Sequence, residues 1–207
     1  MILAGGRSKI QFMKTDKPII ALPYAVGNME IYADAISNAG GALLYVGRDM
    51  ALSETCIRPH GVLLPGAEVG AKAEDYISAI EWTEKNEVSL LAICFGMQAL
   101  ARYLGGKIVD VSGHGAGHHR VNLVPGTIVS GIGSVNSLHE KAVDIGAGGD
   151  FFATAHAGDG AIEAIEPKKP WNSFVLGVQW RPQLLAAKIL AQQKIFDDFV
   201  KAAAGQR

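Results

Sequence analysis

The sequence predicts an α/β protein with a doubly wound, mainly parallel sheet and helices on both faces, a flavodoxin-like arrangement. Three observations point to this class. Short, continuous apolar runs alternate with amphipathic stretches, as expected when strands are buried on both faces by helices. Glycine is abundant, at 25 of 207 residues, which suits many tight connections. A chain of this length is expected to form one domain with a full-sized core, spanning residues 1–207.

The amino-terminal half alternates between strands and helices after a lead-in, Met1–Lys17, that we expect to be loosely ordered. The expected strands are Pro18–Pro23, Ala42–Val46, Gly61–Leu64 and Ser89–Ile93. The expected helices are Met29–Ala39, Ala73–Asn86 and a segment that follows Cys94. Glycine pairs end the first and third helices, where a left-handed residue is favoured. This order predicts a parallel sheet.

The carboxy-terminal half changes to short β segments after Gly106. The expected segments are Lys107–Val111, Val121–Val124, Thr127–Val129, a part of Ser134–Val143, Phe151–Ala155, Ile162–Ile165 and Phe174–Trp180. Asp159-Gly160 predicts a hairpin turn, because both residues tolerate positive φ. The pattern over Pro182–Ala204 predicts one amphipathic closing helix.

Composition excludes several classes of partner. The net charge of −1 gives no reason to expect nucleic acid or an anionic membrane. Two cysteines far apart, Cys56 and Cys94, make no disulfide framework, so we expect a reducing, cytoplasmic location. The first residues lack the apolar run of a signal peptide, and no stretch approaches 18 apolar residues, so no membrane span is predicted.

The most informative stretch is Glu87–Gly106, which places Cys94 at the corner between a buried strand and a helix. Gly96 leaves room for a tight turn there. This is the geometry of a nucleophile elbow, in which the side chain stands above the sheet edge and the helix amino terminus favours a thiolate. The alternative is a small buried cysteine that packs like alanine.

Ligands of open α/β sheets bind at the carboxyl ends of the strands, where Gly66, Cys94 and Arg181 are expected to converge. A cysteine that attacks a carbonyl needs two donors for the developing oxyanion. The backbone N–H groups of Phe95 and Gly66 are the candidates. Gly66 could equally be an ordinary turn glycine.

Five ordered motifs resemble the class I glutamine amidotransferase superfamily, and most closely its γ-glutamyl hydrolase branch, peptidase family C26. They are L-L-P-G (63–66), A-I-C-F-G-M-Q (92–98), N-S-L-H-E-K-A-V (136–143), G-D-G-A-I-E-A-I-E (158–166) and L-G-V-Q-W-R-P-Q (176–183). The resemblance implies a Cys–His–Glu triad that cleaves a γ-glutamyl amide through a thioester. Carried over by position, it makes Cys94 the nucleophile, Gly66 and Phe95 the oxyanion hole, and Gln98, Asn136, Ser137, Leu138 and His139 the substrate-side residues.

The last motif departs from the family pattern. The resembling family has H-P-E where this chain has Arg181-Pro182-Gln183, so the triad histidine and glutamate positions carry arginine and glutamine. A guanidinium has no acceptor lone pair and stays protonated, so Arg181 cannot act as a base. Its charge could hold Cys94 as a thiolate. Because acid–base assistance is worth about 10²–10⁴-fold, we expect hydrolysis by the family mechanism to be crippled.

Other histidines leave two alternatives open. His139 could replace the missing base, or it could shape its loop. His114, His118 and His119 form a glycine-spaced cluster that suggests a metal site. No cysteine or carboxylate joins them at ligand spacing, so we expect no metal and no other cofactor.

The segments Tyr24–Asn28, Ala67–Lys72 and Val111–His118 are brief where the resembling family has longer ones, which predicts a shallow pocket. Three functional hypotheses follow. The first is a weakly active or inactive γ-glutamyl amide hydrolase homologue that binds a γ-glutamyl or glutamine-like small molecule. The second is a non-catalytic binding or regulatory module with a protein partner or a second copy of itself. The third is a Cys94 thiol enzyme of different chemistry, in which Arg181 holds a carboxylate.

Overall fold

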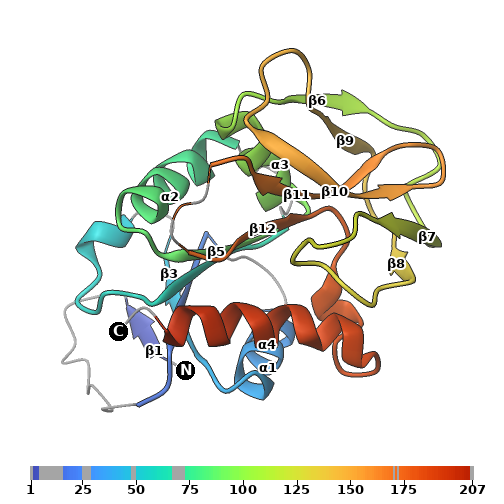
Figure 1. Cartoon of the computed structure of the whole chain (residues 1–207). Coiled ribbons are helices and arrows are strands. Elements are labelled where there is room, and N and C mark those ends of the chain that lie inside the picture. The colour runs from blue at the N-terminus through green and yellow to red at the C-terminus, as the bar shows by residue number, and fades with distance from the viewer. Residues whose placement is uncertain are drawn as a thin grey trace.

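The computed structural model describes residues 2–4, 16–24, 29–47, 50–66, 73–169, 171 and 173–205. Its centre is a mixed sheet whose first six strands in spatial order are parallel (Figure 1). These strands are β1 (Ile2–Ala4), β3 (Ala42–Val46), β2 (Ile19–Pro23), β4 (Gly61–Leu64), β5 (Ser89–Ile93) and β12 (Val175–Val178). The last strand of the chain thus returns to the side of β5. The carboxyl ends of β4, β5 and β12 lie next to one another.

The sheet continues beyond β12 with antiparallel strands. They are β11 (Ile162–Pro167), β10 (Phe151–Ala157), β7 (His118–Leu123) and β8 (Ser134–Asn136). A side branch pairs β9 (Lys141–Asp144) with both β6 (Lys107–Asp110) and β11. The predicted class, an α/β fold with a parallel core and added β segments, is confirmed.

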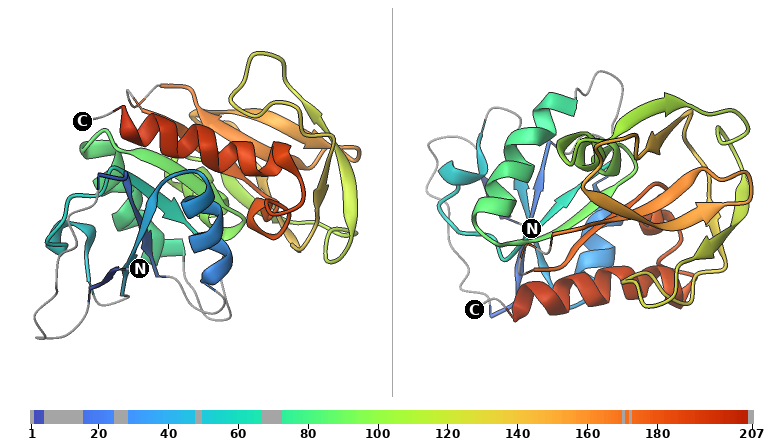
Figure 2. Two further views of the ribbon diagram at one scale, coloured as in Figure 1. Left: turned by 90° about the horizontal axis from the view of Figure 1, so that it is seen from below. Right: turned by 45° about the horizontal axis from the view of Figure 1, so that its top comes forward.

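Helices cover both faces of the parallel part, as Figure 2 shows. The helices α1 (Glu30–Asn38) and α4 (Leu190–Ala204) pack on one face, and α2 (Ala73–Lys85) and α3 (Phe95–Tyr103) pack on the other. Short 3₁₀ turns span Leu52–Glu54 and Pro182–Leu184. Successive residues of a strand enter opposite cores: in β4, Leu63 packs with α1 and α4, whereas Leu64 packs with α2 and α3. This explains why the strands are continuously apolar.

Three predicted elements differ from the structure. Within the expected lead-in, Ile2–Ala4 pairs with β3. Thr127–Val129 forms no strand, because the Thr127 hydroxyl donates to the carbonyl of Val124 at 2.7 Å and closes a local turn. The expected helix over Pro182–Ala204 is interrupted, because the backbone of Ile189 is extended (φ −126°, ψ 106°) and α4 begins one residue later.

The hairpin turn at Asp159-Gly160 is confirmed: Gly160 has φ +91° between the antiparallel strands β10 and β11. Of the segments expected to be brief, residues 25–28 and 67–72 lie outside the described residues. In the part of the chain that the structure describes, every helix is too short or too polar to cross a membrane.

Candidate functional site

Cys94 occupies the predicted corner between β5 and α3, in a strained backbone conformation (φ 54°, ψ −107°). Few residues other than glycine adopt positive φ, and such strain is frequent at functional sites. The turn is tight because Gly96 lies against strand β4: a Cβ on Gly96 would meet the carbonyl oxygen of Leu64 at 2.6 Å. The expected elbow geometry is therefore present, with the Cys94 side chain buried.

Gly66 and Arg181 lie on either side of this elbow, because β4 and β12 flank β5 in the sheet. A Cβ on Gly66 would lie 3.4 Å from both the Cys94 Cβ and the Arg181 Cζ. The backbone of Arg181 is fixed by Asn136, whose Oδ1 accepts from the Arg181 N–H and whose Nδ2 donates to the Arg181 carbonyl, both at 2.9 Å. The structure thus brings together the three residues that the sequence placed at the strand ends.

The sulfur of Cys94 lies among donors, yet its pKa is raised rather than lowered. Burial raises the pKa of the Cys94 thiol, and it outweighs the Arg181 charge and hydrogen bond and the Phe95 N–H, which lower this pKa. The negative charge of Glu163 raises the pKa further. The expectation that Arg181 holds a thiolate is wrong, because the cost of burying the charged sulfur exceeds the attraction of the guanidinium. The Gln179 amide also donates to the sulfur, at 3.8 Å.

Tyr32, a buried residue of α1, is a neighbour of the site that was not predicted from the sequence. Its hydroxyl accepts from the Gly66 N–H at 3.3 Å and from the Gln183 side-chain amide at 3.0 Å. The candidate oxyanion donor of Gly66 and the residue at the triad glutamate position therefore meet at one hydroxyl. No local pattern indicates this contact, since Gln183 is 151 residues away from Tyr32.

The expected substrate-side residues mostly point into internal networks. Gln98 is buried and donates to the Gln179 side chain and to the Lys141 carbonyl, both at 3.3 Å. Ser137 and His139 are buried as well, whereas Leu138 is 40% exposed. Direct contact of Gln98, Ser137 or His139 with a ligand stays a prediction, and Leu138 is the member of the 136–139 loop that faces solvent.

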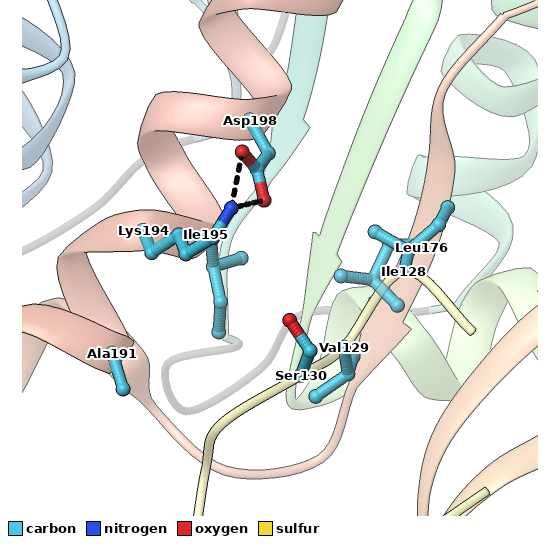
Figure 3. Close-up of a pocket in the computed structure, with 8 residues that line it drawn as sticks. All are labelled: Ile128, Val129, Ser130, Leu176, Ala191, Lys194, Ile195 and Asp198. Carbon is cyan, nitrogen blue, oxygen red and sulfur yellow. Dashed lines mark hydrogen bonds and ion pairs between the residues drawn. The ribbon is translucent and has the colours of Figure 1, made fainter. Parts of the chain in front are cut away.

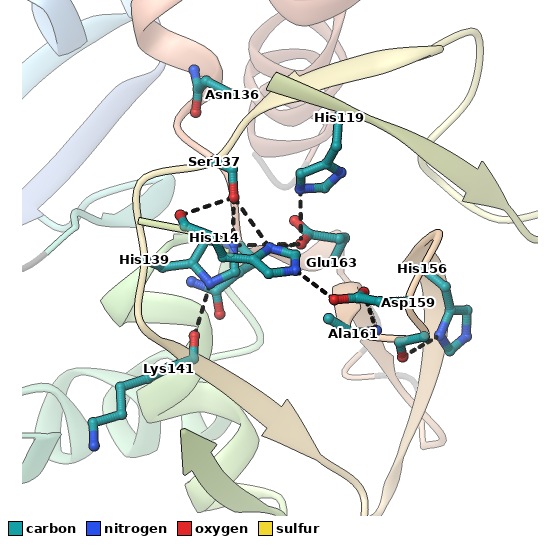
Figure 4. A network of polar contacts seen from close by, with 12 residues as sticks. His114, His119, Asn136, Ser137, His139, Lys141, His156, Asp159, Ala161 and Glu163 are labelled. Carbon is teal, nitrogen blue, oxygen red and sulfur yellow. Dashed lines mark hydrogen bonds and ion pairs between the residues drawn. The ribbon is translucent and has the colours of Figure 1, made fainter. Parts of the chain in front are cut away.

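A buried cluster of three histidines and a carboxylate lies beside this network (Figure 4). It contains His114, His119, His139 and Glu163. The expectation that no carboxylate joins the histidines is wrong, because β11 brings Glu163 among them. His118 is exposed and takes no part, since neighbouring residues of strand β7 point to opposite sides. Glu163 is a charged residue inside the otherwise apolar first part of β11, and this was the sequence feature that could have indicated the cluster.

Two cavities lie away from Cys94. Figure 3 shows one of about 10 Å³ between α4 and the segment around Val129, which has room for roughly one water molecule. Lys194 and Asp198, one turn apart on α4, form an ion pair at its edge. A larger cavity of about 370 Å³ lies at the carboxyl end of α3 beside Tyr103. Burial and the Glu84 carboxylate raise the pKa of Tyr103 to about 12. Neither cavity contains a residue of the elbow.

Comparisons with known proteins give a family match for the sequence and two solved structures with the same fold. The family model described as Peptidase C26 matches residues 71–183, more than half of the chain. A Schizosaccharomyces pombe protein named "putative glutamine amidotransferase" is 29% identical over 88% of this chain and 85% of its own length.

Two crystal structures share the fold. One, of a protein from Thermoplasma acidophilum described as a putative GMP synthase subunit, has a TM-score of 0.77 at 17% identity, covering 93% of this chain and 96% of its own. The other, a glutamine amidotransferase from Thermotoga maritima, has a TM-score of 0.65 at 16% identity, covering 93% and 95%.

Proposed function

Since the chain belongs to the peptidase C26 family of class I glutamine amidotransferase-like proteins, we propose that it binds a γ-glutamyl or glutamine-like small molecule beside Cys94 but hydrolyses it slowly or not at all. The observation that carries this proposal is the surroundings of the sulfur. Among the described residues, its polar side-chain contacts come from Arg181 and Gln179.

Hydrolysis of a γ-glutamyl amide needs a proton acceptor and a proton donor. The thiol must lose its proton as sulfur attacks the carbonyl carbon, and the leaving nitrogen must gain a proton as the C–N bond breaks. A guanidinium cannot accept the first proton, and the neutral amide of Gln179 is too weak a base and too weak an acid to serve in either step at neutral pH. With a thiol pKa above its ordinary value, little nucleophile forms without help. Both steps are therefore slow.

Two observations support retained ligand binding. The Phe95 N–H hydrogen-bonds the Cys94 sulfur and so lies beside the place that a substrate carbonyl oxygen would take, and the Gly66 N–H, on the neighbouring strand end, donates to the Tyr32 hydroxyl. The Arg181 Nε is buried without a hydrogen-bond partner among the described residues. A buried, unpaired charged donor is costly, so a ligand oxygen, above all a carboxylate oxygen, would satisfy it.

The experiment that tests this proposal restores the two missing groups. We expect the double variant Arg181→His, Gln183→Glu to gain Cys94-dependent release of ammonia or amine from glutamine and γ-glutamyl amides, by about 10²-fold or more. The matched control is Arg181→Lys, Gln183→Glu, which keeps a cation and supplies the same carboxylate but no imidazole. If the double variant gains nothing over this control, a missing base is not what limits the reaction.

Ligand binding is tested separately by covalent labelling. A glutamine-mimicking electrophile should label Cys94 faster than a neutral haloacetamide does, and free glutamine should slow this labelling. The haloacetamide corrects for poor access to a buried thiol. Equal rates, or no competition by glutamine, would remove the small-molecule proposal and favour a module that binds a protein partner.

A further inference from the structure

The histidine cluster near the elbow has a converging geometry. His114 lies in the loop before β7, His119 in β7, His139 between β8 and β9, and Glu163 in β11 (Figure 4). The distances from the Glu163 Oε1 are 3.6 Å to His114 Nδ1, 3.4 Å to His119 Nε2 and 3.4 Å to His139 Nε2. Three rings from three parts of the chain thus present one nitrogen each to the same oxygen.

The opposite nitrogen of each ring is held by an outer acceptor. His114 Nε2 lies 2.9 Å from the Asp159 carboxylate. His139 Nδ1 lies 2.9 Å from the carbonyl of Lys141, and His119 Nδ1 lies 3.0 Å from the carbonyl of Arg120. Because these oxygens only accept, each outer nitrogen carries the hydrogen. In a neutral ring the inner nitrogen then presents a lone pair, as in a metal-binding histidine.

The Glu163 carboxylate lacks the partners that a buried charge requires. Its side chain is 0% exposed, and both of its oxygens, like the His119 Nε2, have no hydrogen-bond partner among the described residues. A buried carboxylate without compensation strongly destabilises the folded protein. Lone pairs of neutral rings directed at it would add to the cost, so a positive charge is needed at the centre of the cluster.

We propose that His114, His119, His139 and Glu163 bind one divalent transition-metal ion, with Zn²⁺ as the best fit. Imidazole and carboxylate are ligands that Zn²⁺ accepts, at bond lengths near 2.0–2.2 Å. Two ligands of a tetrahedral Zn²⁺ are then ~3.3 Å apart. The three distances from Glu163 Oε1 agree with this value. All four ligand atoms lie within 4.8 Å of one another, so small ring movements complete the tetrahedron.

The site would be structural rather than catalytic, because four protein ligands close the coordination sphere. Three of its side chains are at most 5% exposed, and His119, at 23%, leaves the path by which an ion could enter. The ion would fasten the glycine-rich loop at His114 and the β8–β9 connection to the sheet. That connection begins directly after Asn136, the last residue of β8, which positions Arg181.

A competing arrangement uses protons instead of a metal. One or more rings would be imidazolium ions, and Ser137, whose hydroxyl lies 3.1 Å from His114 Nδ1 and 3.4 Å from His139 Nε2, would accept from them. Such a cluster is neutralised without any ion. It therefore predicts no stoichiometric metal binding and no response of the melting temperature to chelators.

The experiment is a metal titration of the full chain after treatment with a chelator. We expect one Zn²⁺ per chain by elemental analysis, a rise in melting temperature that depends on Zn²⁺ concentration, and visible ligand-field absorption when Co²⁺ replaces Zn²⁺. The titration is carried out in the Cys56→Ser, Cys94→Ser background, so that no thiol contributes to binding.

Variants assign the ligands. Glu163→Gln keeps the shape of the buried side chain, and His119→Gln alters the ligand nearest to solvent, so both are chosen to preserve the fold. Each should abolish stoichiometric binding, and Asp159→Asn should weaken it about 10–100-fold. His118→Gln, one residue away on the exposed side of β7, should bind as the parent does. Absence of stoichiometric Zn²⁺ binding in the folded parent, or binding unchanged in Glu163→Gln and His119→Gln, overturns the proposal.

Discussion

The pH dependence of Cys94 alkylation tests how burial and Arg181 compete at the elbow. A thiol with the ordinary pKa of 9.0 is about 1% thiolate at pH 7, because each pKa unit is a factor of ten. Burial raises the pKa of Cys94, so its thiolate fraction should be lower still. Had the guanidinium prevailed and brought the pKa to 7, half of the thiol would be ionised. The two outcomes differ by roughly 50-fold in reactivity at neutral pH.

The assay follows iodoacetamide labelling of both cysteines between pH 6 and pH 10 by peptide mass spectrometry. Cys56 is exposed and serves as the reference within the same molecules. We expect the Cys94 rate to rise about tenfold per pH unit from pH 7 to pH 9 without a plateau. Arg181→Met should move the rise to higher pH, whereas Arg181→Lys should move it less. A plateau below pH 8, or no effect of Arg181→Met, would refute the reasoning. Because the pKa of Cys94 is higher in the folded than in the unfolded protein, the thiol proton stabilises the folded state below pH 9. This part of the free energy of unfolding should be lost as the pH rises above 9 and through the pKa of the folded protein.

Two further predictions concern the framework of the site. Gly96→Ala should lower the free energy of unfolding by about 1–3 kcal/mol in a thermal or denaturant melt, because the new Cβ meets backbone of β4. Gly158→Ala, where nothing lies within 4 Å, should be neutral or slightly stabilising, and an equal loss in both variants would contradict the packing argument. Asn136→Ala should cost about 1–3 kcal/mol through its two lost hydrogen bonds to the Arg181 backbone. The exposed Asn122→Ala is its control, and an equal melting temperature for the two would show that Asn136 does not fix the strand end.

The part of the fold that could be predicted follows mostly from local sequence patterns, namely apolar runs and helical spacing. The apolar run Ser89–Ile93 and the helical spacing after it locate Cys94 at its corner, and the parallel direction of the strands follows from the alternating β and α segments. The closing helix was predicted too long, because an apolar pattern continues through residues 185–189 although the backbone at Ile189 is extended. Such a break depends on tertiary packing rather than on periodicity.

The candidate site was predicted less completely, because its remaining features depend on contacts between distant segments. The sequence shows that Arg181 carries a charge near Cys94, but not how strongly the thiol is buried, and burial decides the direction of its pKa. The histidine cluster needed the pairing of β11 with its neighbours before Glu163 could be placed. The alternation of side chains along a strand shows that His118 and His119 point to opposite faces. The sequence does not show which of these two faces is the buried one, so it could not tell which histidine joins the cluster.

The central claim is that Cys94 lacks a group that can take up and return a proton. Its most direct test is the steady-state release of ammonia or amine from saturating glutamine and γ-glutamyl amides by the unaltered protein, measured beside Cys94→Ser. We predict a rate at most slightly above that of Cys94→Ser. Turnover of ~1–10³ s⁻¹, the range typical of enzymes, that disappears in Cys94→Ser would contradict the claim.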